Sequence, residues 1–129
     1  MGKKSALAAD MVCEFVNEAH GNFERVKAML EQEPGLLNAA WDWGGGDWET
    51  GLGAAAHMGR KDIALYLVER GARLDIFAAA MLGRAEVVQA IIAAQPEARN
   101  ALGPHGISLL THAKKGGKEA AAVVKLLQA

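Results

Sequence analysis

The chain has 129 residues, of which 51% are apolar, and its 14 basic and 15 acidic residues give a formal net charge of −1. This composition is typical of one folded domain and excludes a disordered chain. The balanced charge leaves no basic surface, so we expect neither nucleic acid nor a membrane as a partner. A lone Cys13 and the lack of any apolar run of signal-peptide or membrane-spanning length favour a cytoplasmic protein.

Apolar positions at helical spacing predict a series of short helices in the first half of the chain. After a flexible tail, residues 1–4, the expected helices are residues 5–20, 22–33, 50–58 and 61–70. Pro34 ends the second helix. Gly21 and Gly59 separate the members of each pair, and Gly21 is expected to take the left-handed conformation that ends a helix.

The second half of the chain repeats this pattern. A helix restarts directly after Asp75, which is a suitable N-cap residue. Its partner carries Val87, Val88, Ile91 and Ile92, and Pro96 marks the end. The last unit begins near Gly103 and finishes with a helix that contains Val123, Val124, Leu126 and Leu127.

The stretch from Trp48 to Asp75 has a recurring motif. Its matching positions are Thr50, Leu52, Ala55, Ala56, Gly59, Asp62, Ile63, Leu67, Val68, Gly71, Ala72, Leu74 and Asp75. In this register the stretch resembles an ankyrin repeat, although Gly51 and Gly53 replace the proline and histidine of that family. The resemblance implies an all-α solenoid of stacked antiparallel helix pairs, with about eight helices.

The resemblance also implies how the solenoid is divided. We expect one domain, residues 5–129, whose units are residues 5–38, 39–75, 76–100 and 101–129. The glycines that separate the helix pairs, Gly21, Gly59, Gly83 and Gly116, are 38, 24 and 33 residues apart, against roughly 33 for an ankyrin unit. The finger, meaning the loop before each helix pair, is therefore expected to be enlarged in the second unit and missing in the third.

The enlarged second finger, residues 39–49, holds all three tryptophans around a Gly44 to Gly46 turn. Tryptophan is enriched at binding hot spots, and in the resembled family the fingers and the ends of the first helices form the concave binding face. The binding residues predicted on that basis are Trp41, Trp43, Asp47, Trp48, Glu49, His57, Met58, Phe77, Met81, Leu82, His105 and Ile107. The alternative is that the tryptophans only cover the core.

Because the third finger is missing, the second and last fingers are expected to flank a notch floored by Asp75, Ile76 and Phe77. Such a notch would suit a small ligand or one side chain of a partner protein. Our leading hypothesis is a protein interaction module that binds its partner through the tryptophan-rich finger. The alternative is a small-molecule-binding protein or an unusual enzyme that uses the notch.

The histidines give the only starting point for catalysis. His57 and His105 are predicted to face each other across the notch, where Glu49, Asp47 or Asp75 could orient one of them as a general base. Surface or capping roles are the more frequent use of such residues, and no nucleophile or phosphate-binding motif supports the enzyme hypothesis. His20 is expected on the same face and His112 beside the last helix. We expect no metal and no cofactor.

Overall fold

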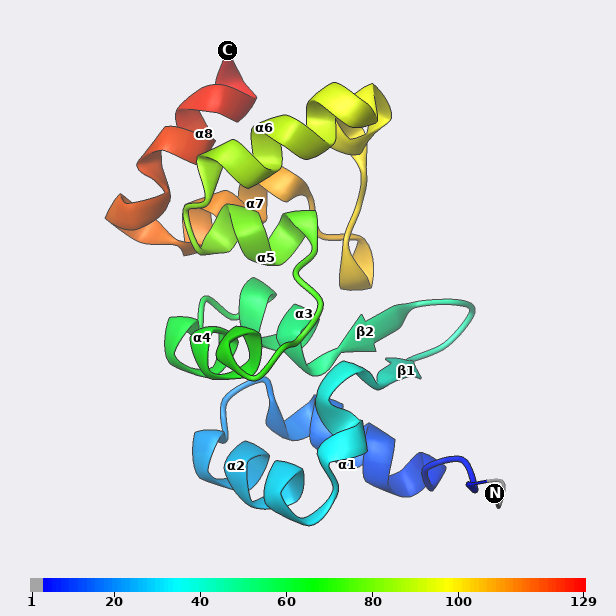
Figure 1. The fold of residues 1–129 in the computed structure, drawn as a ribbon. Helices are drawn as coiled ribbons and strands as arrows, with labels where there is room; N and C mark the ends of the chain where they lie inside the picture. The colour runs from blue at the N-terminus through cyan, green and yellow to red at the C-terminus, as the bar shows by residue number, and fades with distance from the viewer. Residues whose placement is uncertain (1–3) are drawn as a thin grey trace.

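A computed structural model describes residues 4–129, and within this range the chain forms eight α-helices and one small two-stranded sheet. The expected tail at residues 1–4 lies, except for Lys4, outside the described residues. The helices follow one another along the molecule, from α1 near one end to α8 near the other (Figure 1). In the part of the chain that is described, no helix is both long and apolar enough to cross a membrane.

The helices are arranged as four consecutive pairs in two layers. They are α1 (Ala9–Glu18), α2 (Phe23–Gln32), α3 (Gly51–His57), α4 (Lys61–Glu69), α5 (Ile76–Met81), α6 (Ala85–Ala94), α7 (Leu109–Lys115) and α8 (Ala121–Gln128). Helix α1 contacts α3, α3 contacts α5, and α5 contacts α7, so the first members of the pairs form one continuous layer. The prediction of a mostly helical fold built from helix pairs is confirmed.

Polar side chains begin several helices by accepting a backbone N–H that the helix itself leaves free. Thr50 Oγ1 accepts from Gly53 at 3.0 Å, Asp75 Oδ1 from Ala78 at 2.8 Å, and Ser108 Oγ from Thr111 at 3.1 Å. Asp75 is therefore the N-cap that its sequence position predicts. Each cap fixes the point at which a loop becomes a helix.

The glycine between α1 and α2 does not behave as expected. Gly59 and Gly83 have φ values of 68° and 76° after α3 and α5, but Gly21 is absent from the positive-φ residues. Helix α1 ends at Glu18, two residues earlier than predicted, and the Gly21 N–H donates to the Glu18 carbonyl at 3.1 Å. The prediction for Gly21 was wrong because a right-handed turn already carries the chain from α1 to α2.

The loops differ in length as the glycine spacing predicts. The second finger forms a hairpin of β1 (Ala40–Asp42) and β2 (Trp48–Thr50), whereas residues 70–75 before α5 contain no strand. Three glycines, Gly44 to Gly46, turn the hairpin with positive φ values, and the Asp42 carboxylate accepts from the N–H groups of Gly44 and Gly46. The fourth finger, residues 101–108, closes through an antiparallel bridge between Leu102 and Ser108. The two strands were not predicted from the sequence.

Short 3₁₀ helices lie in the loops that connect the α-helices. They are η1 (Pro34–Asn38), η2 (Pro96–Asn100), η3 (Pro104–Gly106) and η4 (Gly117–Ala120). Prolines begin the first three because proline lacks the N–H that a helix leaves unpaired at its start.

Small residues in the first helices allow the pairs to approach each other closely. Fully buried alanines occupy the middle of the layer: Ala54, Ala55, Ala56, Ala78, Ala79, Ala80 and Ala113. Larger side chains fill two adjoining cores, one built around α1 to α4 and the other around α5 to α8, with α5 contributing to both. Space for larger side chains within the alanine layer is therefore small.

We expect Ala79→Leu to destabilise the fold by about 1–3 kcal/mol, because extra atoms in a filled core force neighbouring side chains or backbone apart. Ala79 is fully buried. The matched control is Ala90→Leu on α6, where the alanine is exposed. Chemical denaturation of both variants measures the difference, and equal free energies of unfolding would contradict the packing described here.

Candidate metal centre

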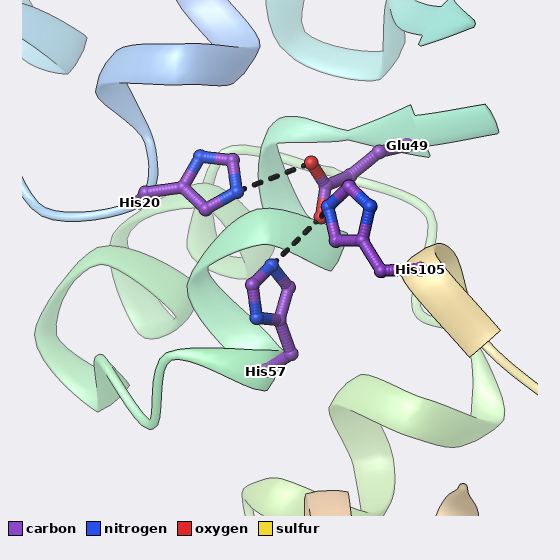
Figure 2. Close-up of side chains that lie close together, drawn as sticks. All are labelled: His20, Glu49, His57 and His105. Atoms are coloured by element: carbon purple, nitrogen blue, oxygen red, sulfur yellow. Dashed lines mark ion pairs between the residues drawn. The ribbon is translucent and has the colours of Figure 1, made fainter. Parts of the chain in front are cut away.

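Four side chains from separate parts of the chain converge on one point. His20 follows α1, Glu49 lies in β2, His57 is the last residue of α3, and His105 lies in the fourth finger. Figure 2 shows these side chains directed toward one another. One nitrogen or oxygen atom from each lies within 4.8 Å of the others.

The Glu49 carboxylate lies at the middle of this cluster and is only 1% exposed. Its Oε1 atom accepts a hydrogen bond from Trp43 Nε1 at 2.9 Å and lies 3.2 Å from His20 Nε2. Its Oε2 atom lies 2.9 Å from His57 Nε2 and 3.3 Å from His105 Nε2. One buried carboxylate therefore faces three imidazole rings.

The carboxylate is ionised despite its burial. Burial alone raises the pKa of Glu49, because it penalises the charged form. The close ring nitrogens of His20 and His57 and the hydrogen bond from Trp43 outweigh that effect and lower the pKa of Glu49 to about 2. The cluster thus has a fixed negative charge at its centre at neutral pH.

Two of the rings are oriented by their outer nitrogens. His20 Nδ1 lies 3.0 Å from the carbonyl oxygens of both Val16 and Asn17, and His105 Nδ1 lies 2.7 Å from Asp47 Oδ2. Carbonyl and carboxylate oxygens only accept, so each Nδ1 must carry the hydrogen. In a neutral ring Nε2 is then unprotonated and points its lone pair into the cluster.

With both Nε2 atoms unprotonated, the negative charge of Glu49 has no cationic partner in the cluster. The lone pair of a neutral His20 would face the carboxylate of Glu49, and two lone pairs repel. The contact becomes favourable when Nε2 is protonated, and the hydrogen bond with Glu49 does raise the pKa of His20 above its ordinary value. A metal cation between the two atoms would satisfy both at once.

The third ring, that of His57, has a buried nitrogen without a hydrogen-bond partner. His57 Nε2 and Glu49 Oε2 are both buried, and neither has a hydrogen-bond partner of acceptable geometry although they lie 2.9 Å apart. The ring centroid of His57 lies 5.0 Å from that of His20 and 5.2 Å from that of His105. Protonating all three rings at this spacing would place like charges together, so protons alone satisfy the cluster poorly.

His105 occupies its place at a conformational cost. Its φ of 62° is the only positive value among the non-glycine residues that the structure describes. The left-handed region is unfavourable for residues with a side chain, and such strain concentrates at functional sites. The second finger holds this conformation, since Asp47 accepts from the His105 N–H at 2.8 Å and from its ring.

Asp47 is correspondingly ionised. The hydrogen bond from the His105 backbone N–H lowers the pKa of Asp47, and the bond from its ring lowers it further. A carboxylate that receives the outer N–H of a histidine is the arrangement that orients metal-binding imidazoles in proteins. Asp47 and His105 have this relation.

The distances suit a transition metal ion. Nitrogen and oxygen ligands about 2.0–2.2 Å from a tetrahedral ion lie about 3.3–3.6 Å apart. His57 and His105 Nε2 lie 2.9 and 3.3 Å from Glu49 Oε2, and His20 Nε2 lies 3.2 Å from Oε1, which is close to that spacing. The four ligand atoms lie within 4.8 Å of one another, so small side-chain movements would complete the geometry. Imidazole and carboxylate are also a donor set that zinc and its neighbours accept.

The structure places the predicted tryptophans differently from one another. Trp43 lies beside the centre, with its ring 6.3 Å from His20 and 6.2 Å from His105, and is 37% exposed. Trp41 is half-buried and packs against the first core, so it has the core-covering role that was the alternative to ligand contact. Trp48 is 60% exposed and lies away from the core.

Other predicted binding residues are only partly available. Met58 is 49% exposed, and Leu82 and Ile107 are half-buried. Met81 is fully buried in the first core, so its prediction as a binding residue was wrong. The helical register of the short α5 directs Met81 inward.

A second feature is a hollow between the second and fourth fingers, with a volume of about 330 Å³. It corresponds to the predicted notch, and Asp75 and Phe77 line it as expected. Ile76 does not, because it is buried in the second core. Asp75 is also outside the histidine cluster, since its carboxylate caps α5, so it does not orient His57 as the catalytic hypothesis required.

The expectation of no metal site rested on His57 and His105 alone. The structure adds His20 and buries Glu49 between all three rings. No protein-family model matches this sequence, and no curated protein matches it either.

We expect Glu49→Gln to destabilise the metal-free protein near pH 5, where His20 is protonated, because folding lowers the pKa of Glu49 to about 2 from an ordinary 4.5. A lowered pKa contributes stability above the unfolded value that is lost as pH falls through the folded value. The gap in the free energy of unfolding between wild type and variant should therefore close toward pH 2, as Glu49 is protonated, and also shrink above the raised pKa of His20, as that ring loses its proton. Urea denaturation across this range measures it, and a gap independent of pH would contradict the assigned charge.

Proposed function

We propose that this protein binds one divalent transition metal ion through His20, Glu49, His57 and His105. The observation that carries the proposal is the buried pair of Glu49 Oε2 and His57 Nε2, which lack hydrogen-bond partners and face the Nε2 atoms of two further histidines. Buried polar atoms without partners are costly, and an ion at this point would give each of them a bond.

The donor set selects the class of metal. Three imidazole nitrogens and one carboxylate suit zinc, cobalt, nickel or iron, whereas calcium and magnesium prefer oxygen ligands alone. Trp43 and Asp47 would form the outer shell, since they hold Glu49 and His105 by hydrogen bonds at 2.9 and 2.7 Å. With four protein ligands and a partly buried position, the ion would stabilise the fold, by an amount that grows with its free concentration.

The scaffold that we propose for this centre is an ankyrin-type solenoid. Two layers of paired helices, left-handed Gly59 and Gly83 between pair members, and a hairpin finger before α3 support it. In that scaffold the ion would join the turn of the first unit to the second and fourth fingers. It would thus link parts of the chain up to 85 residues apart, from His20 to His105.

A second candidate function is binding of a protein partner at the fingers. The observation that favours it is the exposure of Trp48 and Leu102, which are 60% and 65% exposed and flank the hollow. The metal centre uses neither side chain. Exposed apolar residues grouped at one place are typical of interaction surfaces. The cytoplasmic location of the protein also remains a prediction from the sequence.

We expect isothermal titration of the chelator-treated protein with zinc to show one ion per chain, and His105→Asn to weaken binding by at least about 100-fold, since loss of even an outer-shell partner costs 10–100-fold. Asparagine tolerates the left-handed conformation of position 105, so the finger keeps its shape. The matched control is Asp42→Asn, which changes a polar residue of the second finger that lies outside the cluster.

Wild-type stoichiometry well below one ion, or equal affinity in wild type and His105→Asn, would overturn the proposal. Thermal unfolding followed by circular dichroism confirms that each variant is folded before titration. Cobalt gives a second readout, because its visible absorption bands report nitrogen and oxygen ligands in tetrahedral geometry.

We expect zinc affinity to fall as the pH is lowered from about 7.5 to 5.5, because neutral imidazoles bind metal and protonated ones do not. The pKa of His20 is raised by Glu49, so competition from its proton begins above the ordinary value of 6.5. The affinity should therefore decrease already near neutral pH. Titrations at a series of pH values measure the slope, and an affinity constant over this range would show that the histidines are not the ligands.

A further inference from the structure

The hollow between the second and fourth fingers is a separate site from the metal centre. None of the four cluster residues lines it. Its chemistry is set by two carboxylates, two aromatic rings and two apolar residues: Asp47, Asp75, Trp48, Phe77, Leu102 and Pro104. Each finger contributes one wall, and the start of α5 contributes the rest.

The charge of the hollow is negative. Within the part of the chain that the structure describes, its lining includes Asp47 and Asp75 but no lysine, arginine or histidine. Asp75 accepts one N–H, from Ala78, through Oδ1. An ionised carboxylate can accept about four hydrogen bonds, so the helix cap leaves most of that capacity free.

Asp47, from the second finger, adds a second negative group to the lining. Its two oxygens accept from the backbone and ring of His105. The Asp47 side chain remains 31% exposed in this position. The hollow therefore favours a cation.

The rings of Trp48 and Phe77 favour a guanidinium group over an ammonium group. Trp48 is 60% exposed, and Phe77 is half-buried with its ring 4.9 Å from that of His112. Aromatic faces attract cations, and a planar guanidinium stacks on them while it donates to carboxylates in a fork. An ammonium group lacks the flat face, so arginine fits this combination better than lysine.

The exposed residues at the mouth of the hollow indicate whether the cation is a free small molecule or a side chain of a polypeptide. Trp48 and Leu102 remain largely exposed at the mouth of the hollow. A small free cation would leave both in water, whereas a polypeptide that inserts one side chain would cover them with its neighbouring residues. We propose that the hollow binds an arginine side chain of a protein partner, flanked by apolar residues that cover Trp48 and Leu102.

This proposal rests on the second candidate function, binding of a protein partner, and does not require the metal. The probe is a capped tripeptide of arginine between two leucines. Its matched control contains citrulline, which has the shape of arginine without the charge. A third peptide contains three leucines. Shifts of the Trp48 indole N–H signal in nuclear magnetic resonance spectra follow binding, with and without zinc.

We expect the arginine peptide to bind and the citrulline peptide to bind about tenfold more weakly, which corresponds to about 1.4 kcal/mol. Asp75→Asn should reduce arginine binding by a similar factor, because asparagine still caps α5 but carries no charge. Asp42→Asn is the matched control, since it removes the same charge in the second finger outside the hollow. Its affinity should equal that of wild type.

Equal affinity for arginine and citrulline, or no effect of Asp75→Asn, would overturn the inference. If the leucine peptide binds as well as the arginine peptide, the fingers still bind a partner and only the arginine assignment fails. If no peptide shifts the Trp48 signal, both the assignment and the partner-binding function fail. Zinc titration of the same samples tests the metal proposal separately.

Discussion

A buried negative charge at Glu49 constrains the surrounding structure. A carboxylate with 1% exposure needs partners, because its burial without them would cost several kcal/mol. The partners come from three helix pairs and the hairpin itself: Trp43 donates directly, and three histidines point their Nε2 atoms at it. Removing any of these elements would leave the charge less well satisfied, so the centre depends on the stacking order of the whole chain.

The second finger contributes side chains to both the metal centre and the hollow, because a β-strand places alternate side chains on opposite faces. Glu49 points into the cluster, while Trp48, the preceding residue, is exposed and lines the hollow. The glycine turn, held by Asp42, returns the chain so that Asp47 reaches the fourth finger. One hairpin thus contributes to the metal centre on one side and to the proposed arginine site on the other.

The fourth finger shows how local strain is offset by tertiary contacts. His105 has a left-handed backbone, and two hydrogen bonds from it to Asp47 hold it there. Pro104 and the bridge between Leu102 and Ser108 restrict the rest of the loop. The same contacts that place His105 Nε2 in the cluster also fix the distance between the two fingers, and so the width of the hollow.

The sequence by itself determined the helix pairs, the long second finger and the absent third one, because apolar spacing, caps such as Asp75 and the glycine intervals are local signals. It also placed Asp75 and Phe77 at the notch. It placed His20 on the same face as His57 and His105 but did not identify it as a member of one cluster with Glu49, and it counted the buried Met81 as a binding residue. Those features depend on how α1, β2, α3 and the fourth finger stack, since no local pattern encodes the meeting of residues 20, 49, 57 and 105. Only the tertiary structure brought the imidazoles around a buried carboxylate, and burial is what gives that group its need for a cation.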